Sequence, residues 1–252
     1  MLALVKWEIN KIWNTKFLLA AGAILLVLMQ ETFPMMQDRS LNMVYVFIIS
    51  CDLGLIGLLG ASLCVIPYGF QFCDELNSHY YRFVLTRKTK RQYLCSRFIS
   101  SGIASMISIV VPTLIYILIL NIVFCRPASG QNFNLSGTIW GPILNSYGDI
   151  GFFAGQLLIA SVYAFTMGSI SVATAAFTRD KYATIASPFI ASYFSIYISQ
   201  RLGLTFMDFS FGFFPMDVSM PVYISVFAYC VMIIVISFML FLVKTGRGLE
   251  NE

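Results

Sequence analysis

The sequence contains unusually little charge. Charged residues make up 11% of the 252 residues, against about 25% in an average soluble protein. Hydrophobic residues make up 58%, and the mean hydropathy is +0.80. A soluble globule of this length cannot bury so much apolar surface, because roughly a quarter to a third of the unfolded chain's surface stays wet after folding. The composition excludes a soluble enzyme, a disordered chain and a disulfide scaffold, and it predicts an integral membrane protein.

The sequence also lacks the motifs of several kinds of site. With His79 as the only histidine and no CxxC pair among the six cysteines, it offers no zinc site. It has no HExxH motif and no GxxxxGK[ST] phosphate loop. We therefore expect no enzyme activity, metal or cofactor in this chain, and any ATP energy has to come from another polypeptide. The net charge of +4 indicates membrane topology rather than a nucleic-acid partner.

Long apolar runs predict an all-α fold with six transmembrane helices. About 20 helical residues cross the ~30 Å hydrocarbon core of a bilayer. The predicted spans are 17–33, 48–72, 98–124, 150–178, 182–200 and 218–243. Before them, residues 1–16 carry the lysines, tryptophans and apolar arc of an interfacial amphipathic helix. These segments predict a single transmembrane domain over 1–252.

The basic residues predict the orientation of the chain. Thirteen of the sixteen Lys and Arg residues lie before the first span, after the last, or in the loops after the second and fourth spans. The opposite side has only Arg39, Arg126 and Arg201. Because Lys and Arg are concentrated in cytoplasmic segments, both termini are predicted to be cytoplasmic. On the outer side, the aromatic segment 201–217 is predicted to lie at the membrane face or to re-enter it.

The cytoplasmic segment between the second and third spans carries the pattern with most bearing on function. It predicts a short helix over 73–87, whose first turn holds Asp74 and Glu75, where acids favour the helix dipole. An apolar ridge at i, i+4 and i+7 follows, made of Leu76, Tyr80 and Phe83. A short amphipathic helix of this kind commonly docks in the groove of a partner protein. A basic turn, RKTKRQ, leads into the next span.

In this segment the sequence resembles the permease subunits of ABC-2 type transporters. Those proteins have an interfacial helix, six spans, and a coupling helix with an acid, a small residue, an apolar stretch ending Leu-Thr, a basic turn and Tyr-Leu. The matching positions here are Glu75, Ser78, Phe83-Val84-Leu85-Thr86, Arg91 and Tyr93-Leu94. The resemblance covers the layout of the whole chain and is specific over about 72–97. His79-Tyr80 departs from it, because many members have a glycine and a small residue there.

The resemblance implies an exporter subunit in a bacterial plasma membrane. Two permeases pair, as a homodimer or with a similar chain, and a separate cytoplasmic ATP-binding subunit holds ATP and Mg²⁺. The expected cargo is amphiphilic, such as an antimicrobial peptide or a lipid-like molecule. The residues expected to couple the chain to the ATPase are Asp74, Glu75, Leu76, Ser78, Tyr80, Phe83 and Arg87.

Other interpretations of the same residues stay open at the level of sequence. The two acids also fit a role in capping the helix dipole, and the aromatic ridge also fits packing against the bundle. Asp52 is either a group on a transport path or an interfacial residue near the outer surface. Pro67, Pro112 and Pro188 are candidate kinks. For the whole chain, the rival functions are an ion-coupled secondary carrier, a small intramembrane enzyme and a membrane scaffold that transports nothing.

Overall fold

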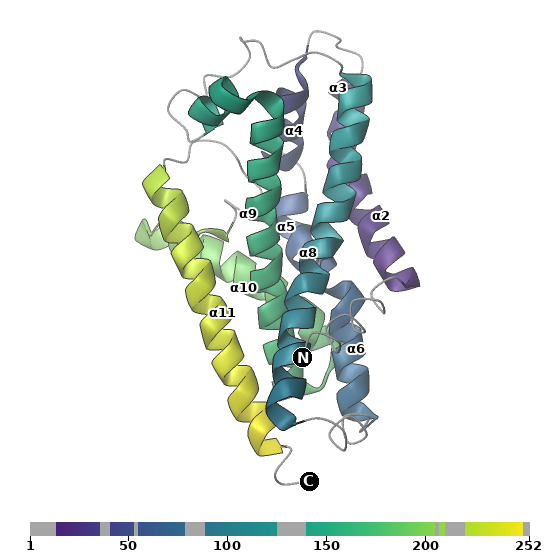
Figure 1. The fold of residues 1–252 in the computed structure, drawn as a ribbon, viewed down its shortest axis with the longest axis vertical. Helices are drawn as coiled ribbons and strands as arrows, with labels where there is room; N and C mark the ends of the chain where they lie inside the picture. The colour runs from purple at the N-terminus through teal and green to yellow at the C-terminus, as the bar shows by residue number, and fades with distance from the viewer. Residues whose placement is uncertain are drawn as a thin grey trace.

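The computed structural model is an all-α bundle (Figure 1). It describes residues 14–35, 41–52, 55–78, 89–124, 140–204, 207–209 and 220–248. These residues are 92% helical and contain no strands. The helices are α2 (Thr15–Gln30), α3 (Thr32–Met35), α4 (Met43–Asp52), α5 (Ile56–Leu63), α6 (Ile66–Asn77), α8 (Lys90–Val123), α9 (Trp140–Thr178), α10 (Lys181–Leu202) and α11 (Met220–Gly248). The predicted all-α class is confirmed.

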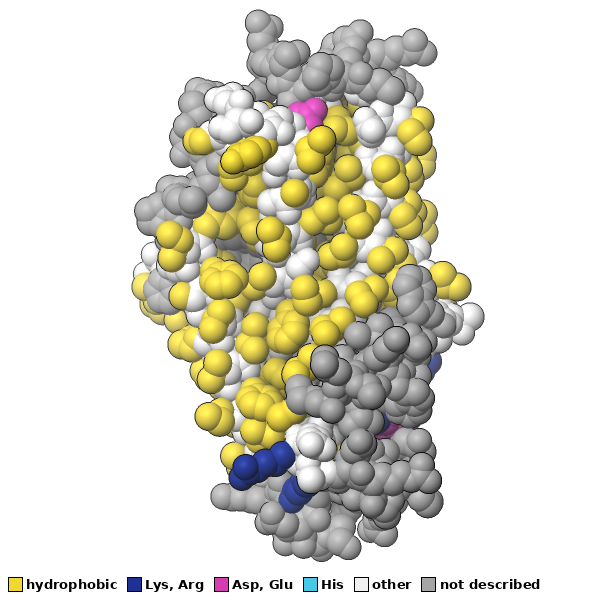
Figure 2. Space-filling view, viewed as in Figure 1, with side chains coloured by type: hydrophobic (Ala, Val, Ile, Leu, Met, Phe, Trp, Pro, Cys, Tyr) yellow, Lys and Arg dark blue, Asp and Glu magenta, His cyan; other side chains and the backbone are white. Residues whose placement is uncertain are grey.

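Three of the described helices are long and apolar enough to cross a membrane, which marks the chain as a membrane protein. They are α8, α9 and residues Val222–Thr245 of α11. Large apolar side chains cover the outward faces of these helices, and Figure 2 shows them as a broad band with Lys and Arg side chains toward one end. Shorter apolar helices occupy Thr15–Gln30, Met43–Asp52 and Leu59–Gly69. Six separate spans therefore stay a prediction, of which the structure supports three.

The structure describes three short helices in the second predicted span, 48–72. Helix α4 ends at Asp52, α5 covers Ile56–Leu63, and Cys64 and Val65 separate α5 from α6. Pro67 lies in the first turn of α6, where its missing N–H costs no hydrogen bond. The proline thus starts a helix instead of kinking one. Helix α6 then continues without a break through Asn77, so the first residues of the predicted coupling helix, 73–77, extend a helix that begins in the apolar run.

Other boundaries also differ from the sequence-based spans. Helix α8 begins eight residues before the predicted span, at Lys90, and α9 begins ten residues early, at Trp140. A bend at Gly148, with φ +62° and ψ −158°, separates the first turns of α9 from its long straight part. Pro112 and Pro188 lie inside helices, as predicted. The predicted interfacial helix falls almost wholly on residues 1–13, outside the described residues.

The centre of the bundle is the contact between α8 and α9, which small residues bring close together. A Cβ added at Gly168 would lie 2.9 Å from the backbone oxygen of Ser101, and one at Gly102 would lie 2.3 Å from the ring of Phe165. The hydroxyl of Ser101 donates to the carbonyl of Gly168 over 3.1 Å. Ala160 and Ala164 of the same helix are buried. The predicted ladder of small residues in this span is therefore confirmed as a packing surface.

Candidate functional site

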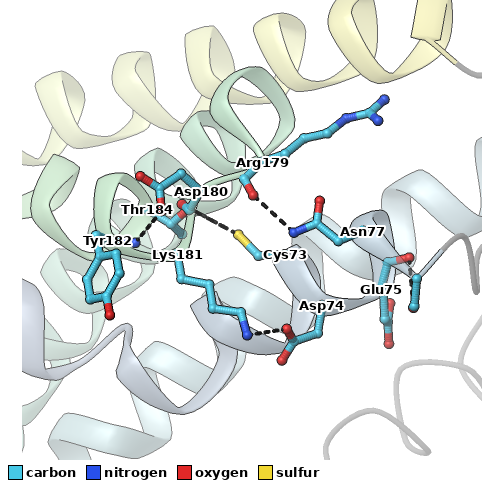
Figure 3. A network of polar contacts seen from close by, with 10 residues as sticks. Cys73, Asp74, Glu75, Asn77, Arg179, Asp180, Lys181, Tyr182 and Thr184 are labelled. Carbon is cyan, nitrogen blue, oxygen red and sulfur yellow. Dashed lines mark hydrogen bonds and ion pairs between the residues drawn. The ribbon is translucent and has the colours of Figure 1, made fainter.

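Helix α6 ends at one end of the bundle, beside the start of α8 and the turn that joins α9 to α10 (Figures 1 and 3). Apolar packing fixes its inner side, where Phe72 contacts the ring of Phe241 with centroids 5.6 Å apart. Leu76 is buried in the same cluster. The polar residues of the last two turns of α6 then make a network with both neighbours. This end of α6 is the candidate functional site, because it leads directly into the segment that carries the coupling pattern.

A buried ion pair joins α6 to α8. Glu75 Oε2 lies 2.5 Å from Arg97 Nη2, and the two side chains are 9% and 2% exposed. The hydroxyl of Tyr68 accepts a hydrogen bond of 3.2 Å from Arg97 Nη1, and the guanidinium stands 5.2 Å from the centroid of the Tyr93 ring. Removing one partner of such a pair strands a charge away from water. The pair therefore couples the position of α6 strongly to that of α8.

A second ion pair, nearer the surface, joins α6 to the start of α10. Asp74 contacts the ammonium of Lys181, and both side chains are about half exposed. The hydrogen bond that the Lys181 ammonium donates to the Asp74 carboxylate raises the pKa of Lys181 above its ordinary value. Because water screens exposed pairs, this contact contributes little to stability on its own.

Uncharged contacts complete the attachment of α6 to the α9–α10 turn (Figure 3). The amide of Asn77 donates to the carbonyl of Arg179 over 3.2 Å. The Cys73 thiol lies 3.2 Å from the Thr184 hydroxyl and 3.7 Å from the carbonyl of Asp180. Burial raises the pKa of the Cys73 thiol, so this cysteine is a packing and hydrogen-bonding group rather than a nucleophile.

The α9–α10 turn is itself short and well ordered by local bonds. Arg179 and Asp180 alone connect the two helices. The Arg179 N–H donates to the carbonyl of Ala175, and the carboxylate of Asp180 accepts from the Tyr182 N–H over 3.0 Å at the start of α10. The end of α6 thus rests against a rigid corner of the bundle.

A polar cleft of about 770 Å³ lies beside α6, among the residues that the structure describes. It separates the start of α2 from α6. Its lining residues are Asn14, Lys16, Pro67, Gln71, Asp74, Glu75, Asn77 and Ser78. The lining mixes both signs of charge and amide groups. Among the described residues, no cluster of histidine, cysteine and acidic side chains forms a metal site.

The structure divides the predicted coupling residues into three groups. Glu75 and Leu76 are buried inside the chain, whereas Asp74 and Ser78 are exposed. Tyr80, Phe83 and Arg87 lie outside the described residues.

Sequence reasoning missed two partners of this network. Arg97 counts as a topology signal in the sequence, but it is buried in an ion pair. Lys181 also counts as a topology signal, and nothing in the linear pattern joins it to Asp74, because 107 positions separate them. A clue to the first was the place of Arg97 two turns inside an apolar helix, where an unpaired charge is costly.

Asp52, the possible pathway residue, is the last residue of α4, and α5 begins at Ile56. Its neighbour Ser50 accepts a 2.7 Å hydrogen bond from Tyr116, and Tyr116 lies about 10 Å before the end of α8 at Val123. Its assignment as a pathway residue or an interfacial residue stays a prediction.

No protein-family model matches this chain, and no curated protein or solved structure shows significant similarity to it.

Proposed function

We propose that this chain is the membrane-spanning permease subunit of an ABC exporter of the ABC-2 type. A separate ATP-binding subunit supplies the energy, and the cargo is amphiphilic, such as a peptide, an antimicrobial compound or a lipid-like molecule. One observation carries the proposal: the first residues of the segment with the family pattern, through Asn77, continue a helix that begins in the apolar core and is tied to two neighbours by ion pairs. A coupling element needs such a rigid connection to the spans.

The geometry supplies a path for mechanical coupling. A force on the segment after Ser78 acts on the end of α6. The Glu75–Arg97 pair passes it to α8, and the contacts with Lys181 and Arg179 pass it to the α9–α10 turn. Helices α8 and α9 are the longest in the described part of the chain and pack along each other. Displacement of α6 therefore shifts the central helix pair of the bundle.

The structure changes which residues we assign to contact with the ATPase. Glu75 and Leu76 become positioning residues, because they hold α6 inside the bundle. Asp74 and Ser78 stay contact candidates, since they are exposed. Together with Tyr80, Phe83 and Arg87, which continue the sequence pattern, they form the proposed contact surface.

The proposed topology has six spans, with both termini in the cytoplasm of a bacterial cell and two permease copies per transporter. Basic side chains at the α6 end of the bundle support this orientation. In the described part of the chain these are Lys16, Lys90, Arg91, Arg97, Arg179, Lys181 and Lys244.

Co-purification tests the proposal. The full chain is extracted from its host in a mild detergent, and bound proteins are identified by mass spectrometry. We expect an ATPase with a phosphate-binding loop, and we expect Tyr80→Ala with Phe83→Ala to lower its recovery at least tenfold while the chain stays in the membrane. Tyr147→Ala with Phe33→Ala is the matched control, because it removes two exposed aromatic side chains away from the α6 end. A chain that purifies alone, even after crosslinking, would refute the proposal.

The position of Asp52 favours one alternative, an ion-coupled secondary carrier. Carriers of that class bind ions at interrupted helices inside the membrane, and a carboxylate in a predicted span is a functional candidate by default. Asp52 is the last residue of α4, and α5 begins at Ile56. This alternative predicts transport that collapses with the proton gradient and is lost in Asp52→Asn. The exporter predicts transport that follows ATP and survives collapse of the gradient.

A further inference from the structure

An apolar pocket of about 380 Å³ lies between α9 and α11, which pack side by side (Figure 1). We call it the α9–α11 pocket. All ten described residues that line it are aliphatic, aromatic or cysteine. Its two walls are formed by Leu158, Ile159 and Val162 from α9 and by Ile224, Val226 and Phe227 from α11. The volume is in the range of ligand sites, which is about 300–1,000 Å³.

Aromatic packing fixes the inner side of the pocket. Phe209, which follows α10, is buried, and its ring stands edge-on to Tyr163 of α9 with centroids 6.2 Å apart. The same ring lies 5.3 Å from that of Tyr229 in α11. The Tyr163 hydroxyl lies 3.5 Å from the hydroxyl of Ser192 in α10. The inner side is therefore held by contacts with three helices.

The outer side of the pocket opens on a surface that faces lipid. Both walls belong to membrane-length segments, Trp140–Thr178 and Val222–Thr245. Leu158 and Ile224, one from each wall, are 68% and 65% exposed. The α11 wall covers residues 223–230, about 10 Å along the first part of that segment. In a membrane, the acyl chains of the bilayer therefore cover the opening.

We propose that the α9–α11 pocket holds one acyl chain of a membrane phospholipid. Water does not fill it, because an apolar cavity offers water too few hydrogen-bond partners. An apolar cavity of about 150 Å³ holds benzene, so by that scale the pocket has room for about fifteen carbon atoms, which is one acyl chain rather than two. An empty pocket loses dispersion contacts along its walls, and an acyl chain that enters from the bilayer restores them. The proposal requires only that the protein crosses a membrane, so it is independent of the transport function.

Photolabelling of the full-length protein tests the site. The protein is kept in mild detergent with increasing amounts of phosphatidylcholine that carries a diazirine on one acyl chain, and labelled peptides are mapped by mass spectrometry. We expect the peptides that line the pocket to reach saturation at low lipid content. Peptides from the outward face of α8, around exposed Leu118, should gain label in proportion to the lipid, because nothing there encloses an acyl chain.

Two variants that fill the pocket should lower this labelling. Val226→Phe adds a ring to the α11 wall, and Leu158→Phe adds one at the opening. Each should reduce pocket labelling about threefold, since dispersion contacts alone give a modest preference. Val235→Phe and Leu118→Phe are the matched controls, because both positions are exposed and lie outside the pocket lining. They should leave pocket labelling unchanged.

The pair of variants keeps the experiment decisive. Val226 is buried, so its replacement can disturb packing, whereas Leu158 is exposed and accepts a larger side chain without a change in melting temperature. Labelling of the pocket that rises in proportion to lipid, or that stays unchanged in Leu158→Phe, would overturn the proposal. A crosslink to a second copy of the protein in place of lipid would also overturn it. So would saturable labelling by a diazirine fatty acid with none by the phospholipid, which would assign the pocket to single-chain amphiphiles.

Discussion

The two ends of the bundle are held together by different chemistry. At the α6 end, charged side chains join helices, and the buried pair Glu75–Arg97 is the strongest of these links. At the opposite end, three buried hydroxyls meet: Thr32 lies 2.6 Å from Tyr116 and 3.2 Å from Ser50, and Tyr116 lies 2.7 Å from Ser50. Neutral hydrogen bonds and aromatic contacts hold that end, with no ion pair between its described residues.

Aromatic packing reinforces the neutral end. The ring of Phe47 meets those of Phe152 and Phe153 edge-on, at centroid distances of 6.0 and 5.3 Å, and Trp140 meets Phe152 at 5.1 Å. Such contacts depend on area and shape, so they tolerate changes of salt and pH. The α6 end instead combines a buried ion pair, which is a strong contact, with an exposed ion pair, which is a weak one. An element that has to transmit force and respond to a partner fits the charged end better.

The largest effect in this comparison should come from breaking the buried ion pair. Arg97→Met leaves the Glu75 carboxylate without its cation, which should cost about 3–5 kcal/mol of unfolding free energy. Replacing both residues, in Glu75→Leu with Arg97→Met, removes both charges and should restore most of that stability. Thermal or denaturant unfolding in detergent measures the stability of the unmodified protein, the single variant and the double variant. A double variant as unstable as the single one would show that the contact is not an ion pair in solution.

The neutral end should respond less to loss of one polar group. Tyr116→Phe removes the hydroxyl that contacts Thr32 and Ser50 but keeps the ring against Phe47. Thr32 retains its bond to the Leu28 carbonyl, so the expected cost is about 1 kcal/mol, the net value of one hydrogen bond. Tyr147→Phe, at an exposed tyrosine, is the control and should leave the melting temperature unchanged. A cost for Tyr116→Phe equal to that of Arg97→Met would remove the contrast between the ends.

Sequence alone was sufficient for features that depend on composition and local pattern. Low charge and long apolar runs predicted a membrane protein and the three membrane-length helices that the structure describes. The small residues of α9 predicted close packing. Both kinds of prediction follow from properties of single segments. Pro67 was visible in the sequence, but its role at the start of α6 depends on where the preceding helix ends. Packing between helices decides where that helix ends, and no local sequence pattern encodes this packing.

The candidate site was only partly predictable for the same reason. The sequence drew attention to Asp74 and Glu75 as ATPase contacts or dipole caps, but their partners within the chain come from α10 and α8, 107 and 22 positions away. Topology rules treat all basic residues alike, so they did not separate buried Arg97 from exposed Arg91. Two side chains on different helices pair only if each helix has the right rotation about its axis and the right position along that axis. The packing of the whole bundle fixes both.

The smallest effect should come from the exposed pair at the α6 end. Asp74→Asn removes its charge and should change stability within experimental error, because the side chains are half exposed and screened. The raised pKa of Lys181 means that this contact contributes below the ordinary lysine pKa and is lost as pH rises through the raised value. NMR titration of labelled lysine should show the Lys181 pKa fall in Asp74→Asn, because the hydrogen bond to the carboxylate is the main cause that raises it. A Lys181 pKa that does not move would mean that the pair does not form in the membrane, and that α6 is tied to α10 only through Asn77 and Cys73.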